Sequence, residues 1–296
     1  MALFAFTAVF VTAFHDPQPH RLQVAIVGAP PALGDARSVL DPQQFSAVPY
    51  ASAASARRAL THDRISGALI GPHVLIASAS GFVAAQMTTR ALQGVAARAG
   101  EHATVSDLRP LPRHDSRGLS PFLTVTSTTM ASIVFAMLLT VAARTHALWV
   151  RVASCALVAA LGGVIVALSV DIVVGALTDN FWGLAGVVSL LIGAVVLSVH
   201  GLGRLLGPAG AGAIALTLVL VGLTSSGAGV GHQLEPGFYR DVSQLLPNGA
   251  AVTAVRNEVY FAGAHTLGAI AVLCAWAAAG ALALATAHRR GPLTLA

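Results

Sequence analysis

Hydrophobic residues are spread unevenly along this chain, and their layout predicts a membrane protein. A short apolar run covers residues 1–14, and residues 15–120 are mixed in character. About 20 apolar residues allow a helix to cross a hydrocarbon core of roughly 30 Å. Five longer apolar runs of nearly this length follow: Phe122–Ala142, Val152–Leu177, Gly183–His200, Ala209–Gly227 and Gly263–Ala287. The pattern predicts an α-helical polytopic membrane protein of six spans, with a polar domain inserted between spans 1 and 2.

The first run, Met1–Phe14, is short for a span and ends at His15-Asp16-Pro17. A secretory signal normally shows a basic start and a small-residue cleavage site, and neither is clear here. We therefore interpret residues 1–14 as the outer part of a first transmembrane helix whose beginning is missing or wrongly assigned. A cleaved signal is the alternative.

Residues 15–120 are typical of a water-facing α/β domain. They hold ten of the seventeen arginines and seven of the twelve acidic residues, with turn formers at Pro30-Pro31, Pro42, Pro49 and Pro72. β-Branched residues between Gly and Pro predict strands, and apolar residues repeating at three and four predict helices. The expected strands are Leu22–Val27, Phe45–Pro49, Ile65–Ile70 and His73–Ala77, and the expected helices are Ser52–Leu60 and Phe82–Ala99.

The composition agrees with a membrane protein and excludes several kinds of chemistry. Hydrophobic residues make up 55% of the chain and charged residues 10%, with a mean hydropathy of +0.75. All seventeen basic residues are arginine, so no Walker A lysine or Schiff-base lysine exists in this sequence. The arginines are scattered without interleaved aromatic residues, so we expect no binding to nucleic acid despite the net charge of +5. We find no catalytic constellation, cofactor motif or metal-ligand spacing.

The arginines of the short loops predict the orientation. Arg144, Arg151, Arg204 and the tail His288-Arg289-Arg290 fall on one side of the membrane if each run is a span. The positive-inside rule places that side, and the carboxy terminus, in the cytoplasm. Residues 15–120 and 228–262 are then extracytoplasmic, in a protein of the plasma membrane.

The segment before the last run, 234–262, predicts an outer helical hairpin. Two short amphipathic helices, broken at Pro247-Asn248-Gly249, fit its sequence and suit a position in or near the membrane interface. Its candidate residues for local pairing are Arg240, Asp241, Arg256 and Glu258, with Pro247 and Gly249 at the break. Plain exposed charges on a surface helix are the equal alternative.

Asp171 lies inside the second long run, in Leu168-Ser-Val-Asp171. A carboxylate within a span is costly and marks a candidate polar pathway or helix contact. Because Asp171 lies near the outer end of the run, a hydrated interfacial residue is the alternative.

By layout, the chain resembles the type 2 ABC exporter permeases, in particular the YhgE/Pip-like branch with its large ectodomain. Residue by residue, the resemblance is carried by Leu245–Phe261 (LLPNGAAVTAVRNEVYF) and by Arg117–Phe122 (RGLSPF). The amphipathic helix that commonly precedes the first span in this family is not present in the sequence.

This resemblance implies a permease subunit that exports a hydrophobic or amphipathic compound. It also implies a dimer with a second membrane subunit and a separate ATP-binding subunit that hydrolyses ATP, so that this chain itself is not an enzyme. The alternative is a non-transporting membrane scaffold or receptor, whose ectodomain binds a cell-envelope component, a secretion partner or a phage.

Overall fold

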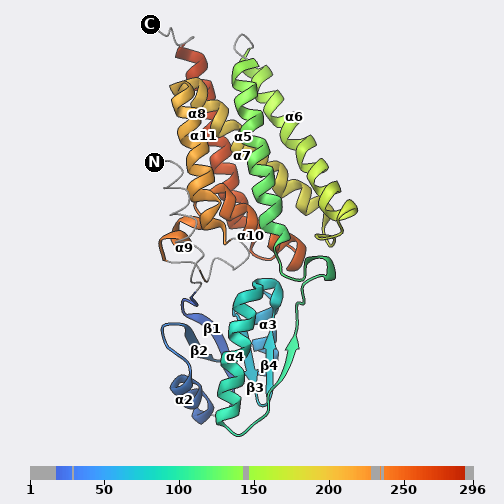
Figure 1. Cartoon of the computed structure of the whole chain (residues 1–296), viewed down its shortest axis with the longest axis vertical. Helices are drawn as coiled ribbons and strands as arrows, with labels where there is room; N and C mark the ends of the chain where they lie inside the picture. The colour runs from blue at the N-terminus through green and yellow to red at the C-terminus, as the bar shows by residue number, and fades with distance from the viewer. Residues whose placement is uncertain (1–17, 29, 143–146, 228–233, 235–236, 291–296) are drawn as a thin grey trace. The chain divides into compact units, whose positions relative to one another are not determined.

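The computed structural model describes residues 18–28, 30–142, 147–227, 234 and 237–290 (Figure 1). The contacts divide them into two compact units, which we describe separately. An α/β unit comprises residues 18–119 and the described part of 227–240, and a helical unit comprises 120–226 and 241–290. The first apolar run, 1–14, lies outside the described residues, so its assignment as a span stays a prediction.

The α/β unit is built on a five-stranded sheet with the order β2-β1-β3-β4-β5. The strands are β1 (Leu22–Val27), β2 (Phe45–Pro49), β3 (Gly67–Ile70), β4 (His73–Ile76) and β5 (Thr104–Asp107). β1 is parallel to β2 and β3, β4 is antiparallel to β3, and β5 is parallel to β4. Parallel neighbours need a crossover, and helices α2 (Pro30–Val39), α3 (Ala53–Thr61) and α4 (Phe82–Arg98) lie in these connections.

Alternation along β1 separates two cores. Val24 and Ile26 belong to a core shared with α2 and α4, whereas Ala25 belongs to a second core shared with α3. Helices therefore cover both faces of the sheet, and the predicted α/β domain is confirmed as a fold. Gly67 of β3 permits a close approach of α4, because a Cβ at this position would overlap the methyl group of Thr88.

Two elements of this unit have no clear sequence signal. Helix α2 begins at Pro30-Pro31, a pair that predicts a turn. Proline is nevertheless accepted in the first helical turn, because its missing N–H would have no helical partner there. All four residues of β5 are exposed, so the strand shows no alternation of apolar and polar residues. The predicted strands and helices otherwise match β1 to β4, α3 and α4 to within two residues.

The helical unit contains all five predicted long runs as helices (Figure 1). They are α5 (Ser120–Ala142), α6 (Leu148–Ala167), α7 (Phe181–Leu206), α8 (Pro208–Thr217) and α11 (Thr266–Arg290). Helices α6 and α8 each continue into a π-helical turn, η3 (Leu168–Val173) and η4 (Leu218–Gly222). Helix α10 (Pro247–Tyr260) precedes α11, and the short helix α9 (Gly237–Ser243) before it is divided between the two units after Arg240.

Four helical segments are long and apolar enough to cross a membrane: Ser120–Thr140, Leu148–Val173, Phe181–Leu206 and Thr266–Arg290. The segment Pro208–Gly222 is apolar but shorter. At 1.5 Å per residue it extends roughly 22 Å, less than a hydrocarbon core of about 30 Å. The described residues thus fit a multi-pass membrane protein with four candidate spans, and the predicted number of six remains a prediction.

Helix α7 is the centre of the helical unit. It packs against α5, α6, α8, α10 and α11. In the most apolar 18-residue stretch of α7, 67% of the residues are buried, whereas the corresponding value for α6 with η3 is 17%. The outward faces carry large apolar side chains, as expected for contact with lipid; they include Leu138, Leu161, Ile165, Leu267 and Leu282.

Contacts between the helices show that α5, α7 and α11 run in the same direction. Thr140, near the end of α5, lies 2.9 Å from His200 near the end of α7, measured from Oγ1 to Nδ1. Gly201 of α7 lies against the backbone of Gly280 in the second half of α11. The ends of these three helices therefore lie at one end of the unit, and their starts lie at the other.

Candidate functional site

Helix α10 lies inside the helical unit rather than on a surface. Twelve of its fourteen residues are buried, and it packs against α5, α7 and α11. The break before it falls at residues 244–246, earlier than predicted, and Pro247 is its first residue. Proline at this position requires no helical N–H partner, which explains why it begins the helix instead of interrupting it. The alternative of plain exposed charges on a surface helix is therefore wrong for α10, and the position of the hairpin at the membrane interface stays a prediction.

Asn248 joins three elements at the start of α10. Its side chain is fully buried, and Nδ2 donates to Oγ1 of Thr129 in α5 at 3.0 Å. Its Oδ1 is buried and has no hydrogen-bond partner among the described residues. Gly222, at the end of η4, allows this approach, because a Cβ there would overlap Oδ1. An acceptor without a partner in a buried site is a position where a hydroxyl, amide or water could bind.

A row of hydroxyl side chains continues from this asparagine along α5. Thr124, Thr128, Thr129 and Ser132 are all buried and share one face of the helix by their spacing. The Oγ1 atom of Thr128 also has no partner among the residues that the structure describes.

The segment after η4 adds three more buried hydroxyl groups, those of Thr224, Ser225 and Ser226. Their side chains donate to carbonyl groups three and four residues earlier, such as that of Val221, which accepts from Ser225 Oγ at 2.6 Å. These bonds satisfy carbonyl groups near the π-helical turn. The buried hydroxyl face of α5, the segment 222–226 and Asn248 at the start of α10 together form a group of buried polar side chains inside the helical unit. We name it the polar seam.

Glu258 connects the far end of α10 to the start of α7. Its Oε2 accepts from Asn180 Nδ2 at 2.8 Å, and Asn180 Oδ1 caps α7 by accepting from Gly183 N at 3.1 Å. Gly183 must lack a side chain here, since a Cβ would overlap both Asn180 and Glu258. Glu258 therefore pairs with a residue 78 positions away in the sequence and outside the hairpin. The sequence predicts local pairing within the hairpin.

We expect replacement of Glu258 by alanine to lower the free energy of unfolding by roughly 1–3 kcal/mol, because hydrogen bonds to charged groups contribute about this much. Glu258→Gln keeps an acceptor for Asn180 and should lie closer to the parent protein. Stability can be followed in detergent through the reactivity of the buried Cys155 thiol during heating, in a Cys274→Ala background that removes the exposed thiol. Equal losses for both variants would contradict the role of the hydrogen bond.

The other predicted hairpin residues differ in their burial and in the elements that they contact. Arg240 and Asp241 lie on α9, half-buried and exposed respectively, whereas Arg256 is buried on α10. Gly249 packs directly on Ser243, because a Cβ would overlap the carbonyl group of that residue. Pro247 begins α10, as described above, and the carbonyl of Leu245 before it accepts from Trp276 Nε1 of α11 at 2.9 Å. The pairing role predicted for the charged residues stays a prediction, apart from the bond of Glu258.

Asp171 lies in the π-helical turn η3 and is half-buried, beside the exposed side chains of Ile172 and Val173. This turn ends the candidate span Leu148–Val173. Both interpretations of the carboxylate, a polar pathway and a hydrated interface, remain open at this position.

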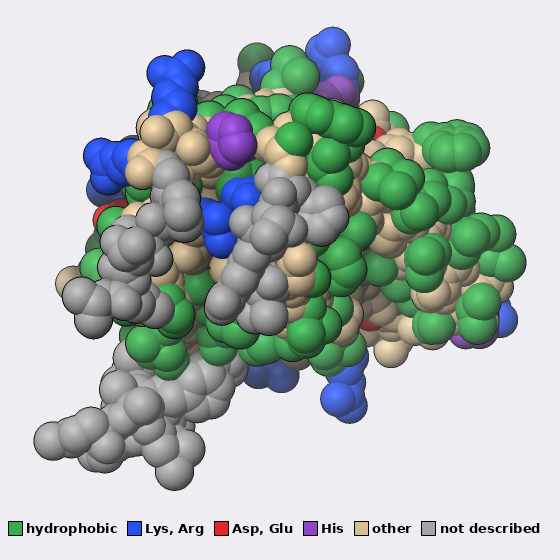
Figure 2. All heavy atoms as spheres, turned by 90° about the horizontal axis from the view of Figure 1, so that it is seen from above, with side chains coloured by type: hydrophobic (Ala, Val, Ile, Leu, Met, Phe, Trp, Pro, Cys, Tyr) green, Lys and Arg blue, Asp and Glu red, His purple; other side chains and the backbone are tan. Residues whose placement is uncertain are grey.

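The end of the helical unit opposite Asn180 and Glu258 is basic. It carries Arg151, Arg204, Arg289 and Arg290, and the sequence segments around these arginines, 142–155, 195–212 and 280–296, contain no acidic residue. Figure 2 looks onto this end and shows blue and purple side chains, with green apolar side chains around them. The loop arginines of the described residues therefore gather at one end of the helices, as the sequence predicted.

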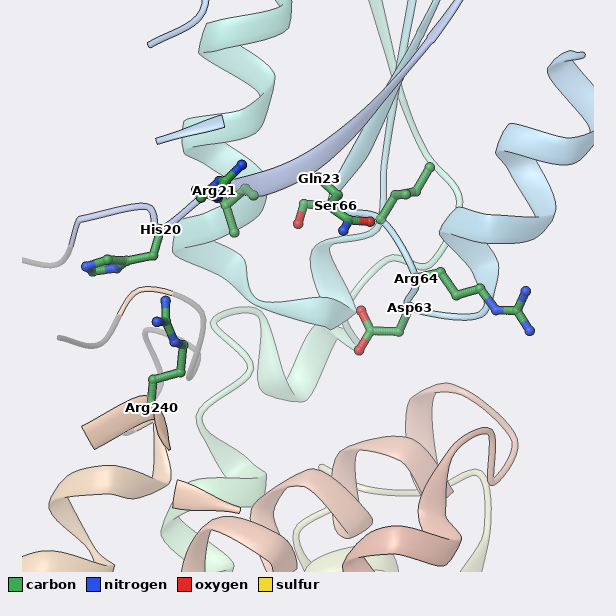
Figure 3. A pocket seen from close by; sticks show the side chains of 9 residues that line it. His20, Arg21, Gln23, Asp63, Arg64, Ser66 and Arg240 are labelled. Carbon is green, nitrogen blue, oxygen red and sulfur yellow. The ribbon is translucent and has the colours of Figure 1, made fainter. Parts of the chain in front are cut away.

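A cavity of about 240 Å³ in the α/β unit lies at the starts of β1 and β3 (Figure 3). Gln23 and Ser66 lie side by side there, joined by a backbone hydrogen bond of 2.8 Å from Ser66 N to Gln23 O. Asp63 and Arg64 follow α3, and Arg240 completes the lining. Its charged lining residues are three arginines, with Arg21 as the third, and one aspartate.

Comparison with known proteins adds no assignment: no family model, no curated protein and no solved structure matches this chain. Within the described residues, no group of three or more His, Cys, Asp or Glu is placed to hold a metal ion.

Asn248, Thr129 and Asn180 were not predicted from the sequence as partners within the helical unit. Hydroxyl and amide residues at helical spacing inside an apolar run were the available signal on α5. The pairings themselves join residues that are 78 and 119 positions apart, so no local pattern could reveal them.

Proposed function

We propose that this chain is the membrane-spanning subunit of an ABC-type exporter that moves a hydrophobic or amphipathic compound. A separate subunit binds and hydrolyses ATP in this proposal, since the sequence has no lysine for a Walker A motif. The proposal includes a dimer, formed with a second copy or with a related membrane subunit.

The polar seam supports this proposal most strongly. Polar groups inside a membrane bundle cost free energy and commonly mark substrate pathways. Here they lie where α10 meets two other helical elements, and two buried acceptor or hydroxyl atoms, Asn248 Oδ1 and Thr128 Oγ1, have no partner among the described residues. π-Helical turns frequently occur at functional sites, and one of them, η4, ends at the glycine that contacts Asn248.

The charge distribution supports the proposed orientation. Four described arginines, in sequence segments without an acidic residue, lie at one end of the helices, which agrees with a cytoplasmic basic end under the positive-inside rule. The α/β unit and the described residues of 237–262 are extracytoplasmic in this proposal, and the basic end is where an ATP-hydrolysing partner would bind.

Purification of the full chain from its native membrane in mild detergent tests the proposal. We expect an ATP-hydrolysing subunit in fixed stoichiometry, whose turnover in reconstituted vesicles depends on this chain. Asn248→Ala should reduce ATP-dependent transport while the complex remains assembled, because the seam is altered and the contact surfaces are not. A preparation without any ATP-hydrolysing subunit, or a turnover unaffected by removal of this chain, would refute the permease function.

A second candidate function is a scaffold or receptor that does not transport. It is favoured by an open groove on the α/β unit, lined by α4 and the segment after β5, which has the size of a ligand site. Deletion of residues 20–115 distinguishes the two functions, since a receptor should lose its phenotype although the spans remain in the membrane. If every phenotype survived this deletion, the receptor function would be excluded.

A further inference from the structure

The groove on the α/β unit has a volume of about 610 Å³, which is within the usual range for sites of small organic ligands, roughly 300–1,000 Å³. Residues of α4 form one wall, and the segment 110–116 after β5 forms the other. This groove lies entirely within residues 76–116, and so within a single compact unit.

Most of the groove surface is apolar. The apolar residues are contributed by β4, by the start of α4 and by a rigid proline-rich segment: Ile76, Phe82, Ala85, Pro110, Leu111 and Pro112. Two prolines restrict the backbone of the second wall, so its shape is largely set before a ligand binds. Such a surface suits a flexible apolar chain.

The charged residues of the groove are two arginines and one aspartate, namely Arg90, Arg113 and Asp107. The carboxylate already accepts three hydrogen bonds from its own chain. Oδ2 accepts from Ser78 Oγ at 2.5 Å, and Oδ1 accepts from Ser78 N at 3.2 Å and from Arg109 N at 3.1 Å.

Ser78 is itself held in place, because its Oγ also accepts from Leu111 N at 3.2 Å. The aspartate therefore serves to fasten the proline-rich wall to the end of β4. The two guanidinium groups give the groove its positive charge. Guanidinium groups bind carboxylate and phosphate oxygens with two parallel hydrogen bonds.

We propose that this groove binds an anionic amphiphile, that is, a molecule with a single apolar chain and a phosphate or carboxylate head. The apolar chain lies along α4 and the proline-rich wall, and Arg90 and Arg113 bind the head. This inference adds a class of substrate or ligand to the proposed function. Only the subsequent export of the bound molecule rests on that function, because binding in the groove requires no ATPase.

A fluorophore placed in the groove tests the proposal with the full chain. Gln93 is exposed and lines the groove, so Gln93→Cys labelled with bimane in the Cys274→Ala background reports on occupancy at this site alone. Octyl phosphate is the probe, octyl glucoside is the uncharged molecule of equal chain length, and inorganic phosphate is the head without a chain. We expect saturable binding of octyl phosphate, at least tenfold tighter than that of either comparison molecule.

Arg90→Gln should weaken octyl phosphate binding by about tenfold or more, which is the factor expected for loss of a charge-assisted hydrogen bond. Arg98→Gln is the matched control, because Arg98 is an exposed arginine of the same helix that does not line the groove. Its binding should stay within about twofold of the parent protein. Gln86→Trp is a second variant, which fills the groove from an exposed position and should abolish binding of every probe.

Equal binding of octyl phosphate and octyl glucoside would overturn the anionic part of the proposal. Equal binding of octyl phosphate and inorganic phosphate would overturn the apolar part, and no response from any probe would overturn the site. Failure in any of these ways would leave the permease function intact, because that function is tested by its ATP-hydrolysing partner.

Discussion

Gly201→Val should cause the largest loss of stability among the substitutions considered for the helical unit. A Cβ at Gly201 would overlap the carbonyl oxygen of Gly280, and a Cβ at Gly280 would overlap the backbone at Leu197 and Ser198. The backbones of α7 and α11 are thus in direct contact, and lipid supplies little hydrophobic force to hold the helices together if this contact is lost. We expect a loss of about 3 kcal/mol, at the upper end for overpacked cores, and a fall in the unfolding midpoint of roughly 5 °C or more.

The matched control is Gly186→Val, on the same helix. Gly186 has nothing within 4 Å of its ideal Cβ position, so valine there adds the same side chain without a clash. The Cys155 thiol assay described above measures both variants, and size-exclusion chromatography shows whether the protein remains monodisperse. If the two variants unfolded at the same temperature, close contact of α7 and α11 at these glycines would be contradicted.

The α/β unit could largely be predicted from sequence because its signals are local. β-Branched residues between Gly and Pro predicted β1 and β2, and the helical repeat of apolar residues in Ser52–Leu60 predicted α3. The hydroxyl of Ser52 accepts from Ser55 N at 3.2 Å, a capping interaction that lies within four residues. β5 was missed since it is an exposed strand, defined by its pairing with β4 rather than by its own residues.

The positions of the long helices were predictable but their packing was not, and the run Ala209–Gly227 forms a helical segment shorter than the predicted span. Apolar runs locate helices without indicating which face meets another helix, and the mean hydropathy of α7 alone did not reveal that it is central. α10 illustrates the limit: its charged residues suggested an exposed helix, whereas the long-range partner of Glu258 and the close contacts of Gly249 place it in the interior. Only residues distant in sequence supply this information.

The second large effect concerns the polar seam and depends on two residues together. Gly222→Ala places a methyl group on the position of Asn248 Oδ1, so we expect a loss of roughly 1–3 kcal/mol in the free energy of unfolding. Asn248→Ala removes the hydrogen bond to Thr129, and hydrogen bonds between membrane helices contribute about 0.6 kcal/mol on average. In the double variant, the methyl group introduced by Gly222→Ala occupies space that the Asn248 amide has vacated. The double variant should therefore be more stable than Gly222→Ala alone, with a coupling energy of about 1 kcal/mol.

A recovery of stability in the double variant distinguishes direct contact between Gly222 and Asn248 from a general weakening of α8 and η4. Gly212→Ala on α8, the helix that continues into η4, serves as the control, because nothing lies within 4 Å of its ideal Cβ position and its effect should be independent of Asn248→Ala. Strictly additive losses for Gly222→Ala and Asn248→Ala would contradict the contact between η4 and α10. Since Asn248→Ala alone costs little stability, any large loss of transport in that variant would have to come from the polar seam itself, which makes it the most informative substitution for the proposed pathway.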